Sequence, residues 1–276
     1  MSTRYRKILV AAALTALALT AILASAANAA TPAPPYQDFA GCPNAEESEF
    51  VGDCIKYEFT GGHIGFGKRD IPVTNPIVLR GGIESETEAF VFNSEGGIVP
   101  VRQPVPGGLV GLTGYKWLDE ALGSSSLLKL YATVELAGQP VNVNEPPMTL
   151  PIKLHLENPF LGEGCYVGSA ANPITLHLTT GTTSPPAPNL PISGHKPGAA
   201  EHEVSRPAVL TARSGLFVDN AYSVPAASGC EFKFGPIHQS IDSQINSSYG
   251  LPSAAGNNTA ELAFNVSLVL ASVVYP

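Results

Sequence analysis

Glycine and proline recur along the whole chain, and this punctuation restricts what the chain can fold into. The sequence has 27 Gly and 25 Pro among 276 residues, spread along its length rather than gathered into one linker. Because both residues weaken or break helices, few stretches can hold a long helix. The apolar residues between the breaks form short runs, as expected of a chain built from strands.

Several of these runs alternate apolar and polar residues, which is typical of strands with one face in the core. Ile152, Leu154 and Leu156 fall on one face of residues 151–157, with polar side chains on the other. Residues 174–179 repeat the pattern. Regular strands separated by turn signals predict a mainly β fold, an antiparallel β-sandwich or barrel-like domain with one or two short helices.

Other runs complete the predicted set of elements. Further strands are expected at residues 55–60, 76–80, 88–93, 98–102, 130–136, 208–211, 215–219, 231–235 and 262–275. Short helices are expected at 115–122 and 236–249. The second would end at Gly250, because glycine suits the left-handed cap position.

The first thirty residues have the order of features that marks a secretory signal peptide. A basic start at residues 4–7 precedes an apolar run at 8–23, and small residues follow at 27–29. An uncleaved anchor is the alternative, because the run is long for a signal and slightly short for a ~20-residue membrane span. The small residues favour cleavage, so residues 1–29 are assigned to the signal peptide.

The rest of the chain is expected to form one domain. Residues 30–36 are rich in Pro and Ala and predict a disordered leader. Residues 37–276 then form a single secreted β-rich domain with a Pro-rich loop at about 180–203. Two domains divided by that loop are the alternative. If Cys165 and Cys230 pair, the loop is an excursion from one domain.

Four cysteines remain after cleavage, an even number in a chain predicted to be exported, and two disulfides are therefore expected. Three pairings are possible. The favoured one joins Cys42 to Cys54 and Cys165 to Cys230. A metal site is the weaker alternative, because no Cys-x-x-Cys occurs and no His lies at a convincing ligand spacing.

Charge excludes some partners. Without residues 1–29, which hold three basic and no acidic residues, the chain has 12 Lys and Arg against 23 Asp and Glu, a net charge of −11. Nucleic acid is excluded as a partner, because phosphate neutralisation needs clustered cations. Attachment to an anionic membrane surface is disfavoured for the same reason, and no stable membrane insertion is expected after signal cleavage.

No strong catalytic motif is present. Ser126 and Lys129 have the Ser-x-x-Lys spacing, but its partner motifs are missing and a Ser-rich turn is the simpler interpretation. His155 and His177 fall on the polar faces of alternating strands, where a solvated imidazole is the ordinary outcome. The sequence therefore leaves any catalytic residue unknown, and it predicts no cofactor and no metal.

Three further clusters also have structural interpretations. His195 and His202, with neighbouring Glu residues, could form a weak surface metal site, but a flexible polar loop is favoured. The Glu residues between 84 and 95 lack the loop pattern of a calcium site and indicate the wet face of a strand. Trp117 and Tyr115 are too few aromatics for a sugar-binding platform and are expected in the core or at a rim.

Several stretches together resemble a group of uncharacterised secreted actinobacterial proteins. The resemblance covers most of the chain after the signal peptide. It implies export and paired cysteines. Because the group has no established activity, the resemblance identifies no residue of this chain as catalytic. The stretches are 157–162 (ENPFLG), 165–168 (CYVG), 178–186 (LTTGTTSPP), 224–227 (VPAA) and 250–260 (GLPSAAGNNTA).

Two functions from different classes are compatible with these observations. The leading hypothesis is a non-catalytic extracellular or cell-envelope protein that acts by binding an unknown ligand or as a surface component. The alternative is an extracellular hydrolase acting on envelope polymers, with its site assembled from distant residues. A cleft that brings two or more of these within hydrogen-bond reach would favour the hydrolase: His155, His177, Asp219, Glu231 and Asp242.

Overall fold

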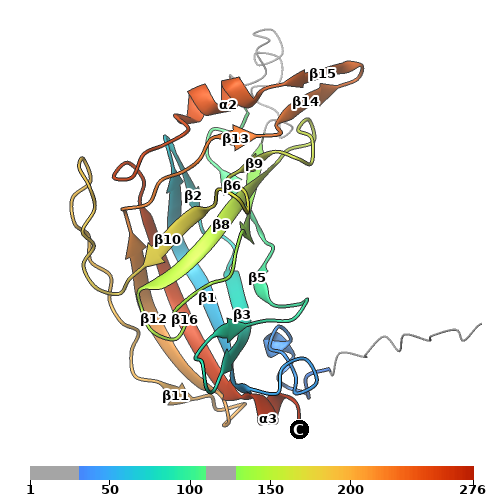
Figure 1. Cartoon of the computed structure of the whole chain (residues 1–276), viewed down its shortest axis with the longest axis vertical. Coiled ribbons are helices and arrows are strands. Elements are labelled where there is room, and N and C mark those ends of the chain that lie inside the picture. Colours follow the sequence, from blue (N-terminus) through green and yellow to red (C-terminus); the bar gives the residue numbers. More distant parts are fainter. Residues whose placement is uncertain (1–30, 110–128) are drawn as a thin grey trace, which may run out of the picture.

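The computed structural model describes residues 31–109 and 129–276 (Figure 1). The predicted signal peptide at 1–29 and the predicted helix at 115–122 lie outside the described residues, as does Ser126. Tyr115 and Trp117 belong to the range 115–122 and therefore also lie outside the described residues. The described chain is mainly β, with antiparallel sheets, short helices and two disulfides, which confirms the predicted fold class.

Two larger sheets and one small hairpin contain the strands of the described chain. The eight-stranded sheet consists of β1 (Val51–Phe66), β2 (Arg69–Pro72), β3 (Ile77–Glu84), β4 (Phe90–Val91), β5 (Gly97–Val99), β11 (Glu201–His202), β12 (Leu210–Asp219) and β16 (Ala260–Leu270). The six-stranded sheet consists of β6 (Arg102–Val105), β7 (Leu130–Leu136), β8 (Met148–Glu157), β9 (Tyr166–Val167), β10 (Ile174–Leu178) and β13 (Ala227–Ser228). The hairpin is β14 (Glu231–Phe234) and β15 (Ile237–Ser240), and the helical segments are η1 (Gln37–Phe39), α2 (Asp242–Tyr249) and α3 (Ala271–Val274).

One cluster of buried side chains joins the inner faces of the two larger sheets. Burial alternates at every residue of β8, so that Ile152 and Leu154 enter the core while the polar residues between them face outward. From the other sheet, the Tyr57 hydroxyl donates to the Val143 carbonyl at 2.8 Å, and burial raises the pKa of Tyr57 to about 12. The period-two pattern therefore places polar side chains on the outer face of the six-stranded sheet.

The eight-stranded sheet has the order β11-β12-β16-β1-β3-β4, with β2 paired to β1 and β5 paired to β3. The predicted runs 208–211 and 215–219 belong to one strand, β12, whose register against β16 shifts between Ala212 and Gly215. Gly215 is required there, because a Cβ would lie 2.4 Å from the Phe264 ring. The gap between the two runs is thus a bulge rather than a turn.

Both predicted disulfides are confirmed: Cys42 is joined to Cys54, and Cys165 to Cys230. The second spans 65 residues and includes the Pro-rich loop at 180–203. The single domain over 37–276 remains a prediction. Part of the loop lies along β12, where His195 and Leu216 exchange two backbone hydrogen bonds of 3.0 and 2.9 Å.

Two predicted elements at the C-terminal side have different boundaries. The predicted helix at 236–249 begins only at Asp242, because residues 237–240 pair with β14 as a hairpin. Its end is as predicted, since Gly250 has a φ of 67° in the left-handed region. The predicted strand at 262–275 ends at Leu270, where the short helix α3 begins.

The acidic residues at 84–88 were predicted to form the wet face of a strand, and this is wrong. β3 ends at Glu84, and the chain then turns back toward β4. The backbone N–H of Glu88 donates to the Glu84 carbonyl at 3.0 Å, and Glu88 has a φ of 57°. These glutamates therefore belong to the turn between β3 and β4.

The segment at 31–36 has defined contacts, in place of the predicted disordered leader. The Ala33 N–H donates to the Val274 carbonyl at 2.8 Å, and Pro32 is buried. An apolar cluster joins Phe39, Cys42 and Cys54 to the C-terminal residues. We call this assembly the terminal clasp: residues 33–48, 203–209 and 271–275 around the Cys42–Cys54 disulfide.

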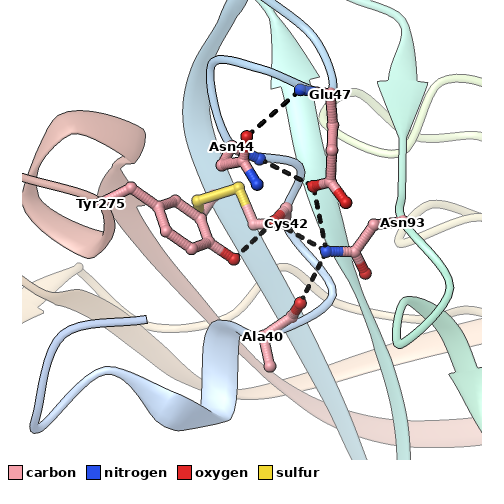
Figure 2. The surroundings of a disulfide bond; sticks show 7 residues. Ala40, Cys42, Asn44, Glu47, Asn93 and Tyr275 are labelled. Carbon is pink, nitrogen blue, oxygen red and sulfur yellow. Dashed lines mark hydrogen bonds between the residues drawn. A yellow bond between two sulfur atoms is a disulfide. The ribbon is translucent and has the colours of Figure 1, made fainter. Parts of the chain in front are cut away.

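Hydrogen bonds tie three parts of the chain together beside this disulfide (Figure 2). The Tyr275 hydroxyl donates to the Cys42 carbonyl at 2.8 Å. The Asn93 amide donates to the carbonyls of Ala40 and Cys42 at 2.9 and 3.3 Å. Burial is the main reason that the pKa of Tyr275 is raised to about 12. The clasp thus anchors the ends of the described chain to β1 and to the loop after β4.

Candidate functional site

The main candidate site is a cleft of about 710 Å³ on the outer face of the six-stranded sheet. Its walls come from β6, β7, β8, β9 and residues 158–163, close to the Cys165–Cys230 disulfide. β9 and β13 lie near the end of the molecule opposite α3 (Figure 1). The cleft and the terminal clasp therefore occupy opposite ends.

Strand register brings the polar side chains of the cleft together. In the ladders, Thr133 lies opposite His155, and Tyr131 lies opposite Glu157. His155 in turn lies opposite Tyr166 of β9. Because side chains directly opposite each other on one face are neighbours, the outward residues of three strands form one continuous surface.

Glu157 is held in its ionised form by the cleft wall. The Thr133 hydroxyl donates to one carboxylate oxygen, and the Arg102 Nε donates to the other at 2.7 Å. Partial burial opposes ionisation, but these hydrogen bonds and the Arg102 charge outweigh it and lower the pKa of the Glu157 carboxyl. Glu157 is 17% exposed and Arg102 is 67% exposed, so the guanidinium remains accessible to a ligand.

His155 is fixed by contacts on the same face. Its ring stacks on Tyr166 with the centroids 4.5 Å apart and 14° between the planes, and its Nδ1 lies 3.7 Å from a Glu135 oxygen. Lys153 completes the group. Its ammonium lies 4.3 Å from the Tyr166 ring centroid and 3.0 Å from Glu135. The His155 imidazole is therefore packed in one group with the Lys153 ammonium and the Tyr166 ring. Contacts with Glu135 of β7 and Tyr166 of β9 set its position.

Other groups in the cleft have unused capacity. Within residues 31–109 and 129–276, Lys129 and Glu163 have no ion-pair partner, and the Tyr131 ring has no aromatic partner. The hydroxyls of Tyr131 and Tyr166 have no hydrogen-bond partner in the same ranges. These groups can bind a ligand without breaking an interaction of the fold.

The structure does not bring the five predicted hydrolase residues together. His155 lies in the cleft, whereas His177 lies outside it, with its Nδ1 3.3 Å from the Thr149 hydroxyl. Asp219 is 2% exposed and accepts the backbone N–H groups of His177 and Ala221 at 2.7 and 2.9 Å. Both oxygens of the Asp219 carboxylate thus already accept backbone hydrogen bonds.

Neither Glu231 nor Asp242 lines the cleft, although the Glu231 carbonyl accepts the N–H of Gly162 in the cleft wall at 2.8 Å. Glu231 is exposed and pairs with Lys233 at 3.1 Å and His238 at 3.4 Å. Asp242, in the first turn of α2, accepts the Cys230 N–H at 2.7 Å. The arrangement that would have favoured a hydrolase is therefore not present among these five residues.

The loop histidines do not converge either. His195 Nδ1 lies 3.2 Å from the Lys196 carbonyl, and His202 Nδ1 lies 2.6 Å from the Pro207 carbonyl. No group of three or more His, Cys, Asp or Glu in the described part of the chain is arranged to hold a metal ion. In the same part, none of the helices has the length and apolarity needed to cross a bilayer.

A second cluster of charged side chains lies in the terminal clasp, but these side chains already pair with one another. Asp38 forms ion pairs with Lys56 and, at 2.6 Å, with Arg206. Arg206 also pairs with Glu203 at 2.8 Å, and the Thr211 hydroxyl donates to Glu203 at 2.8 Å. Burial opposes ionisation, but these partners lower the pKa of both carboxyls. The clasp cluster therefore stabilises the fold and is a poor ligand site.

Sequence reasoning identified His155 but missed Arg102, Tyr131, Glu157 and Tyr166 as members of one site. The alternation in the predicted strand 130–136 does contain a signal, because it places Tyr131 on the face that carries the polar residues of that strand. Tyr166 lies in a strand of two residues, which is too short for a periodic pattern.

A scan of protein-family models and a search of curated proteins both find no match to this chain.

Proposed function

We propose that the protein is exported and acts in the cell envelope or outside the cell as a non-catalytic binding protein, with the cleft as its ligand site. The order of features in the first 29 residues and the two disulfides support export, because disulfides persist in oxidising compartments. The resemblance to secreted actinobacterial proteins supports the same location.

The pairing of Glu157, one of the two carboxylates in the cleft, is the observation that supports binding without catalysis. A glycosidase acid needs a raised pKa at neutral pH, whereas Arg102 and Thr133 lower the pKa of Glu157. His155 is stacked on Tyr166 beside Glu135. No Ser, Thr or Cys is among the described residues that line the cleft, because Thr133 is buried behind them with its hydroxyl bonded to Glu157. The cleft thus offers hydrogen-bonding groups and aromatic surface to a ligand, which are features of a binding site.

Export is tested by the intact mass of the protein from culture supernatant and from washed cells, with and without reductant and alkylation. We expect a supernatant species that lacks about 29 residues and has no free thiol until it is reduced. A full-length, cell-bound species with alkylatable cysteines would overturn export.

Binding is tested by co-sedimentation of the mature protein with insoluble envelope material of the producing cells, with a parallel assay of released fragments. We expect retention without release. The variant Arg102→Glu places a second carboxylate beside Glu157 and should lower retention at least fivefold. Arg213→Glu on β12, an exposed cation of the other sheet, is the matched control. Release of fragments would support the hydrolase instead, and equal retention of both variants would exclude the cleft.

A further inference from the structure

The cleft is balanced in charge although the chain is strongly acidic. Arg102 and Lys129 contribute two cations, and Glu157 and Glu163 contribute two anions. A ligand with a large net charge would therefore meet both attraction and repulsion in the same cleft. This balance favours a neutral ligand that offers both hydrogen-bond donors and acceptors.

The two tyrosines of the cleft differ in the surface that they leave open. The Tyr166 ring is covered by the parallel His155 ring and by the Lys153 ammonium. Tyr131 has no ring or cation partner among residues 31–109 and 129–276, and it is half-buried in the cleft wall. Tyr131 is thus the aromatic face that a ligand can cover, while Tyr166 offers its hydroxyl.

The two neighbouring strands place one polar residue and one apolar residue beside Tyr131. Glu157 lies directly opposite it in the β7–β8 ladder, and Pro104 lies opposite it in the β6–β7 ladder. The Arg102–Glu157 pair therefore presents donors and an acceptor beside an aromatic face. A sugar ring has a C–H face that packs on an aromatic ring and hydroxyls at its rim that both donate and accept, which matches this arrangement.

The floor of the cleft is unsuited to a peptide that binds as an added strand. Strand addition uses the unpaired backbone groups of a sheet edge. β7 and β8 are internal strands in the order β13-β9-β8-β7-β6, so their backbone groups are paired with neighbouring strands. The cleft floor consequently offers side chains and few main-chain groups.

We infer that the cleft binds a neutral saccharide, with one sugar ring lying on Tyr131 and its hydroxyls bonded to the Arg102–Glu157 pair. This inference rests on the proposed binding function and adds the chemical class of the ligand. Tyr131 is the contact with the largest share of the affinity, because it supplies the apolar surface that the sugar covers.

The probes are two fractions of the same envelope material. One contains neutral oligosaccharides, released by mild acid hydrolysis and passed through cation and anion exchangers. The other contains peptides released by protease. Binding of each fraction to the mature protein is measured by calorimetry, and binding of the intact material by co-sedimentation.

We expect the oligosaccharide fraction to bind and Tyr131→Ala to weaken it about tenfold, the size of one well-packed aromatic contact. Tyr131→Phe keeps the ring and should bind within threefold of wild type. His177→Ala removes a polar-face residue of the same sheet outside the cleft and is the control. If Tyr131→Ala does not fold, shifts of the Tyr131 ring protons during titration of wild type provide the same test.

The outcomes separate the two proposals. Binding of the peptide fraction alone, or saccharide binding that Tyr131→Ala leaves unchanged, would overturn the saccharide inference and leave the binding function standing. A titration of wild type that leaves the Tyr131 ring protons unshifted would also overturn it. Failure of the intact envelope material and both fractions to bind would overturn both.

Discussion

The terminal clasp and the cleft both contain an arginine paired with carboxylate, but the arginine is mostly buried in the clasp and mostly exposed in the cleft. In the clasp, Arg206 is 15% exposed and lies between two carboxylates, and the ring of Phe39 packs against it. In the cleft, Arg102 has one carboxylate partner and is 67% exposed. Removing the buried Arg206 would leave its partner carboxylates without their cation and cost stability, whereas the exposed Arg102 guanidinium is available to a ligand.

The largest expected effect comes from the disulfide beside the cleft. Replacing Cys165 and Cys230 together by Ala should lower the free energy of unfolding by about 4 kcal/mol on the loop-entropy model, because the bond closes a separation of 65 residues. The same change at Cys42 and Cys54, which are 12 residues apart, should cost about 3 kcal/mol. Urea unfolding of both variants measures the difference. The reverse order would mean that strain or unfolded-state structure outweighs loop length.

Next in size is the loss of the central cation of the clasp. Arg206→Met leaves Asp38 with Lys56 alone and removes the ion pair of Glu203, so we expect about 3 kcal/mol of destabilisation. Urea unfolding at neutral pH checks this value. A loss below about 1 kcal/mol would mean that the clasp network contributes no more to stability than ordinary surface ion pairs.

Acid should weaken the clasp, because the pKa values of Asp38 and Glu203 are below their ordinary values of 3.8 and 4.5. A depressed pKa in the folded state gives stability that is present above the unfolded-state pKa and lost as the pH falls through the folded-state pKa. Unfolding free energy should thus fall as the pH drops below about 5, and less steeply in Arg206→Met. Parallel pH curves for the two proteins would contradict this origin.

The smallest expected effect on stability is in the cleft. Arg102→Ala removes a mostly exposed ion pair and should cost less than about 1 kcal/mol, while weakening ligand retention. Thermal unfolding and co-sedimentation on the same samples separate the two effects. A stability loss as large as that of Arg206→Met would remove the distinction between the two regions.

Alternation made most of the strands predictable, because burial of one face is a local signal along the chain. Strand β8 is an example, since Ile152, Leu154 and Leu156 were predicted to face the core, although the strand begins earlier, at Met148. Only β15 was mistaken for the start of a helix, because four residues are too few to show a clear period, whereas β14 lies within the predicted strand at 231–235.

The cleft could not be predicted in the same way. Arg102, Thr133 and His155 lie in one row only because β6, β7 and β8 pair at a particular register. No single strand contains that information, since register depends on which neighbour it finds. The disulfides could be predicted because four cysteines allow few pairings, but the residues that they hold in place could not.

The position of β16 affects when the molecule can fold. β16 is the last strand of the chain, yet it lies inside the sheet, between β12 and β1. Until residues 260–270 have been synthesised, β1 with β3 and β12 with β11 are two separate pieces that lack the strand between them. Contacts of such long sequence separation form late and slowly. The two parts of the eight-stranded sheet can therefore be joined only after residues 260–270 have been synthesised.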